Sequence, residues 1–193
     1  MTAITNPEKI TAEEYFRLTK DIEERTELID GHIVFLDRDE TGNPLALAAP
    51  STIHQTLVGR LFSRADSFIL ANQGTCKALL APYDVVLDDE NTVQPDVFVV
   101  CDGSKIDDHR CNGAPDWIIE VTSSNRMDDF ARKLALYKLH GVREYWIVDT
   151  DGKRVIVYNF DQHPNVVEFY DWTDTIPVSI YGGKLTIRIA DLV

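Results

Sequence analysis

The sequence lacks the features that mark membrane-spanning, secreted and repeat-built chains. No apolar run among its 193 residues approaches the roughly 18 residues that a membrane-spanning helix needs. The opening stretch, MTAITNPEKI, has neither a basic start nor an apolar core, so it is unlike a secretory signal. The chain also contains no internal repeat and no low-complexity segment. We therefore expect a cytoplasmic globular protein built as a single domain.

Cysteine is scarce, and the three cysteines are not spaced as they are in metal or redox motifs. Cys76, Cys101 and Cys111 form no CxxC pair. Adding His109 to Cys101 and Cys111 matches no familiar zinc spacing. An odd number of cysteines without a secretory signal argues against a disulfide framework. We expect all three to be ordinary thiols that pack as small apolar side chains.

Basic residues are scarce as well. The net charge is −13, from 32 acidic and 19 basic residues. A protein that grips phosphates without specificity usually carries a basic surface, and this composition does not show one. The acids are concentrated in residues 1–40, whereas the stretch 101–145 is nearly neutral. An acidic excess of this kind is usually a solvated surface.

What is present is the composition and patterning of a globular protein, 44% hydrophobic and 26% charged. Helical periodicity and capping signals, including a capping box from Thr11 to Glu14, predict helices over 11–20, 51–74 and 126–141. A hairpin is predicted over 26–36, turning at Asp30-Gly31. Further strands are predicted over 75–81, 83–88, 95–102, 116–121, 144–149, 153–160, 165–172 and 184–190. This order indicates an α/β (α+β) fold in which helices flank a mixed sheet.

Three predicted strands begin or end in an acid. Glu120 lies near the end of the apolar strand 116–121, Asp96 follows Pro95 at the start of its strand, and Asp84 begins a third. Glu120 and Asp96 can meet at one edge of a sheet, and Asp84 could join them. Carboxylates so close repel one another unless something compensates. A hard divalent cation such as Mg²⁺, which is often held by one or two carboxylates and a substrate phosphate, is the usual compensation.

The helix at 126–141 adds a lysine to these acids. At 100° per residue, Phe130, Leu134 and Tyr137 face the core, and Lys133 lies at the border of that face. The turn before the helix is short, so the Lys133 ammonium should reach past the strand ends. A metal there would activate water, and the lysine would orient it or stabilise the transition state.

A simpler reading of the same residues stays open. Asp129 and Lys133 are an i,i+4 pair, which by itself explains both as a surface salt bridge. Glu120 and Asp96 could lie at solvated strand ends. His54 could be a packed histidine, and Glu27 an exposed strand residue.

Five segments carry a resemblance to a known family. They cover most of residues 27–149 and are, in order, ELIDGHIV, STIHQTLVGRL, APYDVVLDDENTVQPDVFVV, DWIIEVTSS and DDFARKLALYKLHGVREYWIVD. The pieces QPD, EV-x-S and KLALY…GV-EYWIVD are specific in combination. On these segments the chain resembles the Uma family of bacterial "putative restriction endonucleases", within the PD-(D/E)XK nuclease superfamily.

The resemblance implies a restriction-endonuclease-like domain over 1–193, with the nuclease core at about 51–149. The N-terminal helix and hairpin would precede this core and the C-terminal strands would follow it. The implied activity is that of a hydrolase, a Mg²⁺- or Mn²⁺-dependent endonuclease acting on DNA. The resemblance assigns the metal to Asp96, Glu120 and the Val121 carbonyl, adds Lys133 and Glu27 as catalytic residues, and places His54, Asp84 and Tyr137 beside the site.

Two departures from the family pattern accompany these matches. The superfamily lysine usually lies two residues after the second acid, where this chain has Thr122. The Uma family places it on the following helix, in agreement with Lys133. Ser123-Ser124 stands where family members often have Ser-Pro.

Two other functions remain open at this stage. An inactive nuclease fold used as a binding or assembly module fits the charge of −13, because DNA affinity would need positive charge from elsewhere. A phosphoesterase for a small substrate would need no basic groove. A homodimer is also conceivable. Its interface could come from Tyr158, Phe169, Tyr170 and Trp172, although we favour a core position for these residues.

Overall fold

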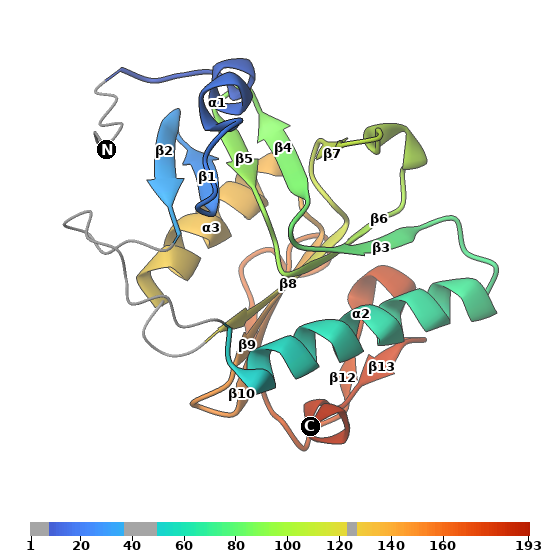
Figure 1. The fold of residues 1–193 in the computed structure, drawn as a ribbon. Coiled ribbons are helices and arrows are strands. Elements are labelled where there is room, and N and C mark those ends of the chain that lie inside the picture. The colour runs from blue at the N-terminus through green and yellow to red at the C-terminus, as the bar shows by residue number, and fades with distance from the viewer. Residues whose placement is uncertain (1–7, 37–49, 123–126) are drawn as a thin grey trace.

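The structure, a computed structural model, describes residues 8–36, 50–122 and 127–193 (Figure 1). Within the last range, the side chains of residues 127–131 are not described. The predictions for Asp129 and Phe130 and the departure at Ser123-Ser124 therefore lie outside the described residues. The fold is α+β with mixed sheets, as the sequence predicted.

A mixed sheet of six strands forms the centre of the molecule. In spatial order its strands are β11 (Val167–Asp171), β10 (Arg154–Asn159), β9 (Glu144–Asp149), β8 (Trp117–Thr122), β6 (Val97–Val100) and β3 (Lys77–Leu80). Strands β8 and β9 are parallel, and the other neighbours are antiparallel. Every residue of β8 and β9 is buried, which explains their near-continuous apolar sequence, because central parallel strands are covered on both faces.

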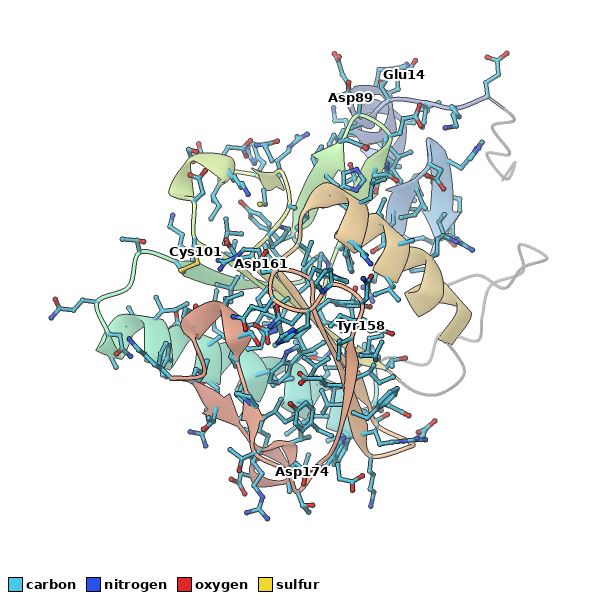
Figure 2. The ribbon with its side chains drawn as sticks, turned by 180° about the vertical axis from the view of Figure 1, so that it is seen from behind. Glu14, Asp89, Cys101, Tyr158, Asp161 and Asp174 are labelled. Carbon is cyan, nitrogen blue, oxygen red and sulfur yellow. A yellow bond between two sulfur atoms is a disulfide. The ribbon has the colours of Figure 1, made fainter. Side chains whose placement is uncertain are left out.

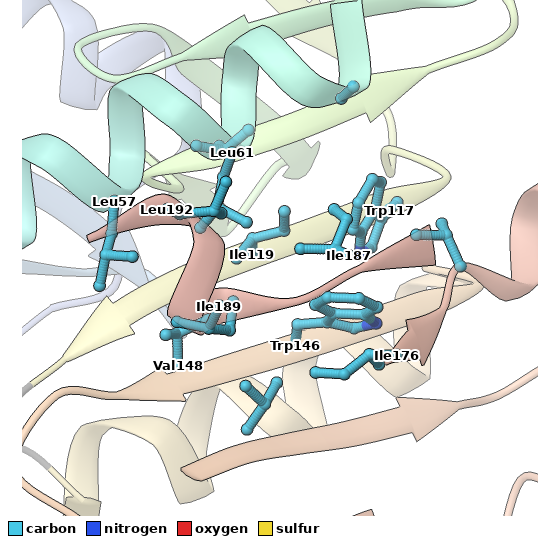
Figure 3. Packing of buried hydrophobic residues seen from close by; sticks show 14 of the residues in the cluster. Leu57, Leu61, Trp117, Ile119, Trp146, Val148, Ile176, Ile187, Ile189 and Leu192 are labelled. Atoms are coloured by element: carbon cyan, nitrogen blue, oxygen red, sulfur yellow. The ribbon is translucent and has the colours of Figure 1, made fainter. Parts of the chain in front are cut away.

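Helix α2 (Thr52–Ala71) covers one face of this sheet. Leu57 and Leu61 of α2 pack with Ile119, Trp117 and Trp146 of the sheet, as Figure 3 shows. The C-terminal elements complete this layer and are β12 (Ile176–Pro177), η3 (Ser179–Tyr181), β13 (Thr186–Ile187) and η4 (Ile189–Leu192). The strand predicted over 184–190 is thus too long, because the chain turns into a 3₁₀ helix at Ile189.

Helix α3 (Met127–His140) joins β8 to β9 and packs on the opposite face with a second sheet. The strands of that sheet are β2 (His32–Phe35), β1 (Thr26–Ile29), β5 (Asn91–Val93), β4 (Asp84–Asp88) and β7 (Arg110–Asn112), in this spatial order. Strands β5 and β7 were not predicted, because three residues are too few to show a period. A 3₁₀ turn, η1 (Gly103–Lys105), precedes β7.

The N-terminal segments close the outer side of the second sheet. Helix α1 (Ala12–Thr19) has the predicted capping box between Thr11 and Glu14. Asp30 (φ 50°) and Gly31 (φ 76°) both adopt positive φ, as a type I′ hairpin turn requires. Ala12 N donates to Asp89 O at 2.6 Å, which joins the start of α1 to the β4–β5 turn. The reverse view accordingly shows Glu14 and Asp89 together at one tip (Figure 2).

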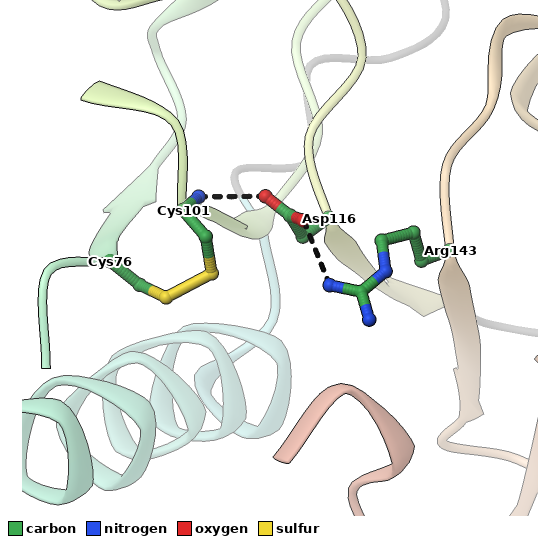
Figure 4. The surroundings of a disulfide bond; sticks show 4 residues. All are labelled: Cys76, Cys101, Asp116 and Arg143. Carbon is green, nitrogen blue, oxygen red and sulfur yellow. Dashed lines mark hydrogen bonds and ion pairs between the residues drawn. A yellow bond between two sulfur atoms is a disulfide. The ribbon is translucent and has the colours of Figure 1, made fainter. Parts of the chain in front are cut away.

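The expectation of three ordinary thiols is wrong for two of them. Cys76 and Cys101 form a disulfide, and Cys111 is a buried free thiol. The pairing follows from sheet register: Lys77 lies opposite Val100, so the residues just before β3 and just after β6 also face each other. Cys101 N donates to Asp116 beside this bond, as Figure 4 shows. The two cysteines are 25 residues apart, so no short motif reveals the bond.

The aromatic residues near the C-terminus do not share one environment. Trp172 is 9% exposed and belongs to the core, as we expected, whereas the expected core position is wrong for Phe169, which lies on the edge strand β11 and is 65% exposed. Tyr158 stacks between Tyr145 and Phe160. Across the ranges that the structure describes, we find no helix with the length and apolarity that crossing a bilayer requires.

Candidate active site

Lys133 lies at the point where the two sheets meet helix α3. Its Nζ donates to Oε1 of Glu27 at 2.9 Å and to Oε1 of Glu120 at 3.3 Å. Glu27 belongs to β1 of the five-stranded sheet and Glu120 to β8 of the six-stranded sheet. Lys133 is only 5% exposed, so it is not a surface salt-bridge residue, and Glu27, at 0%, is not an exposed strand residue.

Two backbone hydrogen bonds link Asp96 to the end of β8. Asp96 N donates to Oε2 of Glu120 at 3.3 Å, and Val121 N donates to Oδ2 of Asp96 at 2.9 Å. The antiparallel register that pairs Val97 with Ile119 places Asp96 opposite Glu120. The structure thus brings together the two strand-end acids, which are separated by 24 residues in the sequence.

Tyr137 lies one helical turn after Lys133 and reaches the same carboxylate. Its hydroxyl donates to Oε1 of Glu120 at 3.0 Å, and its side chain is fully buried. Because residues four apart share one face of a helix, α3 delivers an ammonium and a hydroxyl to one oxygen. This fixes the orientation of the Glu120 carboxyl group.

The site holds more negative groups than positive ones. Burial raises the pKa of Glu120 to about 7; the charge of Lys133 opposes this rise, and Asp96 and Glu27 add to it. Oε2 of Glu27 is buried and has no hydrogen-bond partner among the described residues. A buried carboxylate oxygen without a partner is costly, so this atom is suited to accept a hydrogen bond from water or to face a cation.

The raised pKa predicts how stability depends on pH in the metal-free protein. Because the pKa of Glu120 is raised from 4.5 to about 7 in the folded state, this group favours folding most below about 4.5. That contribution is lost as the pH rises through about 7. Glu120→Gln keeps a neutral acceptor for Lys133 and Tyr137. We expect its free energy of unfolding, measured in urea, to increase relative to that of the wild type as the pH rises across this window.

Glu13→Gln on the exposed side of α1 is the matched control, and its stability should follow the wild-type pH curve. If the Glu120→Gln and wild-type curves run parallel between pH values of about 4.5 and 7, Glu120 does not titrate in this window.

His54 and Asp84 lie beside these residues in different ways. Nε2 of His54, in the first turn of α2, is 3.3 Å from Oδ2 of Asp96. Asp84 does not join Asp96 and Glu120; its Oδ1 instead accepts from Nε2 of Gln94 at 2.9 Å. Gln94 N donates to Oε1 of Glu27 at 3.0 Å, so Gln94 links Asp84 to the site. Sequence reasoning missed Gln94, although it directly precedes Pro95 and Asp96.

The residues offer a small set of oxygen donors for a metal. Among the residues that the structure describes, no group of three or more His, Cys, Asp or Glu side chains is arranged to hold an ion. Asp96 and Glu120 nevertheless supply two adjoining carboxylates, and Asp96 is 14% exposed at its side chain. Mg²⁺ is commonly bound through one or two carboxylates, with waters and substrate phosphate completing the shell. The donor set therefore fits Mg²⁺ or Mn²⁺.

Comparison with solved structures defines the class of fold. A crystal structure described as that of "a putative nuclease belonging to DUF820", from Anabaena variabilis ATCC 29413, is similar to this chain with a TM-score of 0.72. The similarity covers 95% of this chain and 97% of that chain, at 23% sequence identity. The two chains therefore share one fold.

Residues 12–187 match the model of the Uma2 family, described as "Putative restriction endonuclease". The match covers most of the chain, which therefore belongs to the Uma2 family. A search of curated proteins found no match. The resemblance inferred from five short segments is thus confirmed and extends beyond residues 27–149 on both sides.

Proposed function

We propose that the chain is a metal-dependent endonuclease that hydrolyses phosphodiester bonds of DNA. The observation that carries the proposal is the buried ammonium of Lys133 between Glu27 and Glu120, with Asp96 adjoining Glu120. Burying such a cluster costs stability, and a module used only for assembly would gain little from it. Membership of the Uma2 family supports a nuclease over the other readings.

In this proposal Asp96 and Glu120 hold Mg²⁺ or Mn²⁺, with the Val121 carbonyl as a further ligand. When bound, the ion lowers the pKa of a water molecule and neutralises charge that develops on the phosphate. Asp96 is the more exposed of the two acids, at 14% of its side chain against 7% for Glu120. The substrate phosphate would therefore approach from the side of Asp96.

The remaining residues orient water and balance charge. Oε2 of Glu27 has no partner among the described residues, so it can accept a hydrogen bond from the attacking water and direct it. The Lys133 ammonium stabilises negative charge in a site with little water, where such charges interact strongly. Tyr137 holds Oε1 of Glu120 and leaves Oε2 on the side of Asp96.

The metal part of the proposal is tested by calorimetry and cleavage together. Wild-type protein should bind Mn²⁺, and the Asp96→Ala/Glu120→Ala double variant should not. The titration is run with and without a phosphorothioate DNA duplex, because substrate phosphate supplies ligands to such ions. Asp96→Asn should lower cleavage by at least about 100-fold, since losing several kcal/mol of charge stabilisation costs tenfold for each ~1.36 kcal/mol.

Asp89→Asn is the matched control, because it makes the same charge change at an exposed turn and should leave cleavage and Mn²⁺ binding unchanged. Cleavage that survives Asp96→Asn at the wild-type rate would contradict this site. Metal binding that survives in the double variant would place the ion elsewhere.

A further inference from the structure

A cavity of about 210 Å³ opens where α1 meets one end of the five-stranded sheet. Its lining includes Tyr15 and Phe16 of α1, Arg25, and three residues at strand ends, Thr26, Asp84 and Gln94. Typical small-molecule pockets measure ~300–1,000 Å³, so this cavity fits a single small planar group rather than a whole nucleotide. The proposed catalytic residues do not line it.

Gln94 connects the cavity to the catalytic site. Its backbone N donates to Glu27, and its side-chain amide donates to Asp84. Thr26, which also lines the cavity, directly precedes Glu27 in β1. Neighbouring residues of a strand point to opposite faces of the sheet, so the cavity lies across β1 from the carboxylate that we propose directs the attacking water. Gln94 reaches that carboxylate from the cavity lining.

The lining is chemically suited to a hydrogen-bond donor and poorly suited to phosphate. Oδ2 of Asp84 and Oε1 of Gln94 have no hydrogen-bond partner among the described residues, and both atoms are accessible to solvent. Both can accept from a ligand. Glu23 and Glu24 also line the cavity, so its acids outnumber its one arginine and disfavour an anion.

An aromatic wall completes the cavity. Phe16 lines it, and the guanidinium carbon of Arg110 lies 3.8 Å from the centre of the Phe16 ring. Tyr15 packs edge-on against Phe16 at 5.2 Å and anchors its own hydroxyl on Thr26. These contacts hold the wall in place. Aromatic side chains beside a backbone-binding site are a common platform for unpaired bases.

We propose that this cavity binds one unpaired nucleobase of the substrate strand and selects a base with an exocyclic amino group. Asp84 and Gln94 accept from that amino group, as carboxylates accept from cytosine and amides from adenine. Phe16 contacts the base face. The inference rests on the proposed nuclease function for the identity of the strand, but the binding of the base itself does not require cleavage.

Free nucleosides test the cavity without metal and without cleavage. Cytidine and adenosine, titrated at millimolar concentration, should shift the backbone amide NMR signals of Thr26 and Gln94 in a saturable way. Uridine should bind about tenfold more weakly, the lower end of what one well-formed base contact is worth. Asp84→Asn presents an amide donor in place of the carboxylate and should turn the preference toward uridine.

Asp89→Asn changes the same charge outside the cavity and should leave the order of nucleoside affinities unchanged. The inference is overturned if cytidine and uridine bind equally or not at all. It is also overturned if Asp84→Asn and Asp89→Asn behave alike. Nucleoside binding without any DNA cleavage would instead count against the proposed function and leave the base site standing.

Discussion

Replacing Lys133 with methionine is expected to abolish metal-dependent cleavage and also to destabilise the folded protein. The lysine is buried between Glu27 and Glu120, and removing one partner of a buried ion pair costs about 3–5 kcal/mol. Loss of a charge that stabilises the transition state lowers the rate by about 10²–10³-fold. Urea unfolding at neutral pH and a plasmid cleavage assay measure the two effects separately.

A second variant separates stability from catalysis. Adding Glu27→Gln to Lys133→Met removes one of the two carboxylates that lose the ammonium, so the double variant should recover part of the lost stability without recovering cleavage. Such recovery is the coupling expected of residues in direct contact. Lys138→Met, on the exposed side of the same helix, loses hydrogen bonds to Pro164 and Asn165 and should keep near-wild-type cleavage.

The assignment of Lys133 fails if Lys133→Met cleaves DNA at the wild-type rate. If the double variant regains cleavage together with stability, Lys133 and Glu27 support the fold and neither takes part in the reaction.

Replacing Cys76 and Cys101 with serine is expected to lower the free energy of unfolding by about 3–4 kcal/mol, from the chain entropy of the loop that the disulfide closes. That loop spans a sequence separation of 25 residues. For a chain of this size each kcal/mol moves the melting temperature by about 2–4 °C, so Tm should fall by about 6–16 °C. Calorimetric melting of the oxidised protein and of the double variant measures the difference.

Reductant supplies the control for the disulfide prediction. It should lower the melting temperature of the wild type towards that of the Cys76→Ser/Cys101→Ser variant and leave the variant unchanged, because the remaining thiol, Cys111, is buried and unpaired. Equal melting temperatures for the oxidised wild type and the variant would show that this bond does not stabilise the protein.

Much of the local structure was readable from spacing along the chain. The capping box at Thr11 and Glu14 and the turn at Asp30-Gly31 predicted α1 and the first hairpin. The apolar runs predicted the buried strands β8 and β9. These features depend on residues a few positions apart, and that is the range over which helical and strand periods operate.

Part of the site was readable in the same way. The helical period placed Tyr137 on the core face of its helix and Lys133 at the border of that face, and both reach Glu120 in the structure. The positions of Asp96 and Glu120 at strand ends predicted that they could meet, and the β6–β8 register brings them together.

Contacts between distant segments were decided by tertiary structure alone. Glu27 pairs with Lys133 across 106 residues, and Cys76 meets Cys101 because β3 and β6 align in one register. The short strand β5 leads into Gln94, which links Glu27 to Asp84. Periodicity specifies the face of a helix or strand on which a side chain lies, whereas strand order and register specify which residues that face contacts. Strand order and register depend on packing of the whole core, so no short stretch of this chain encodes them.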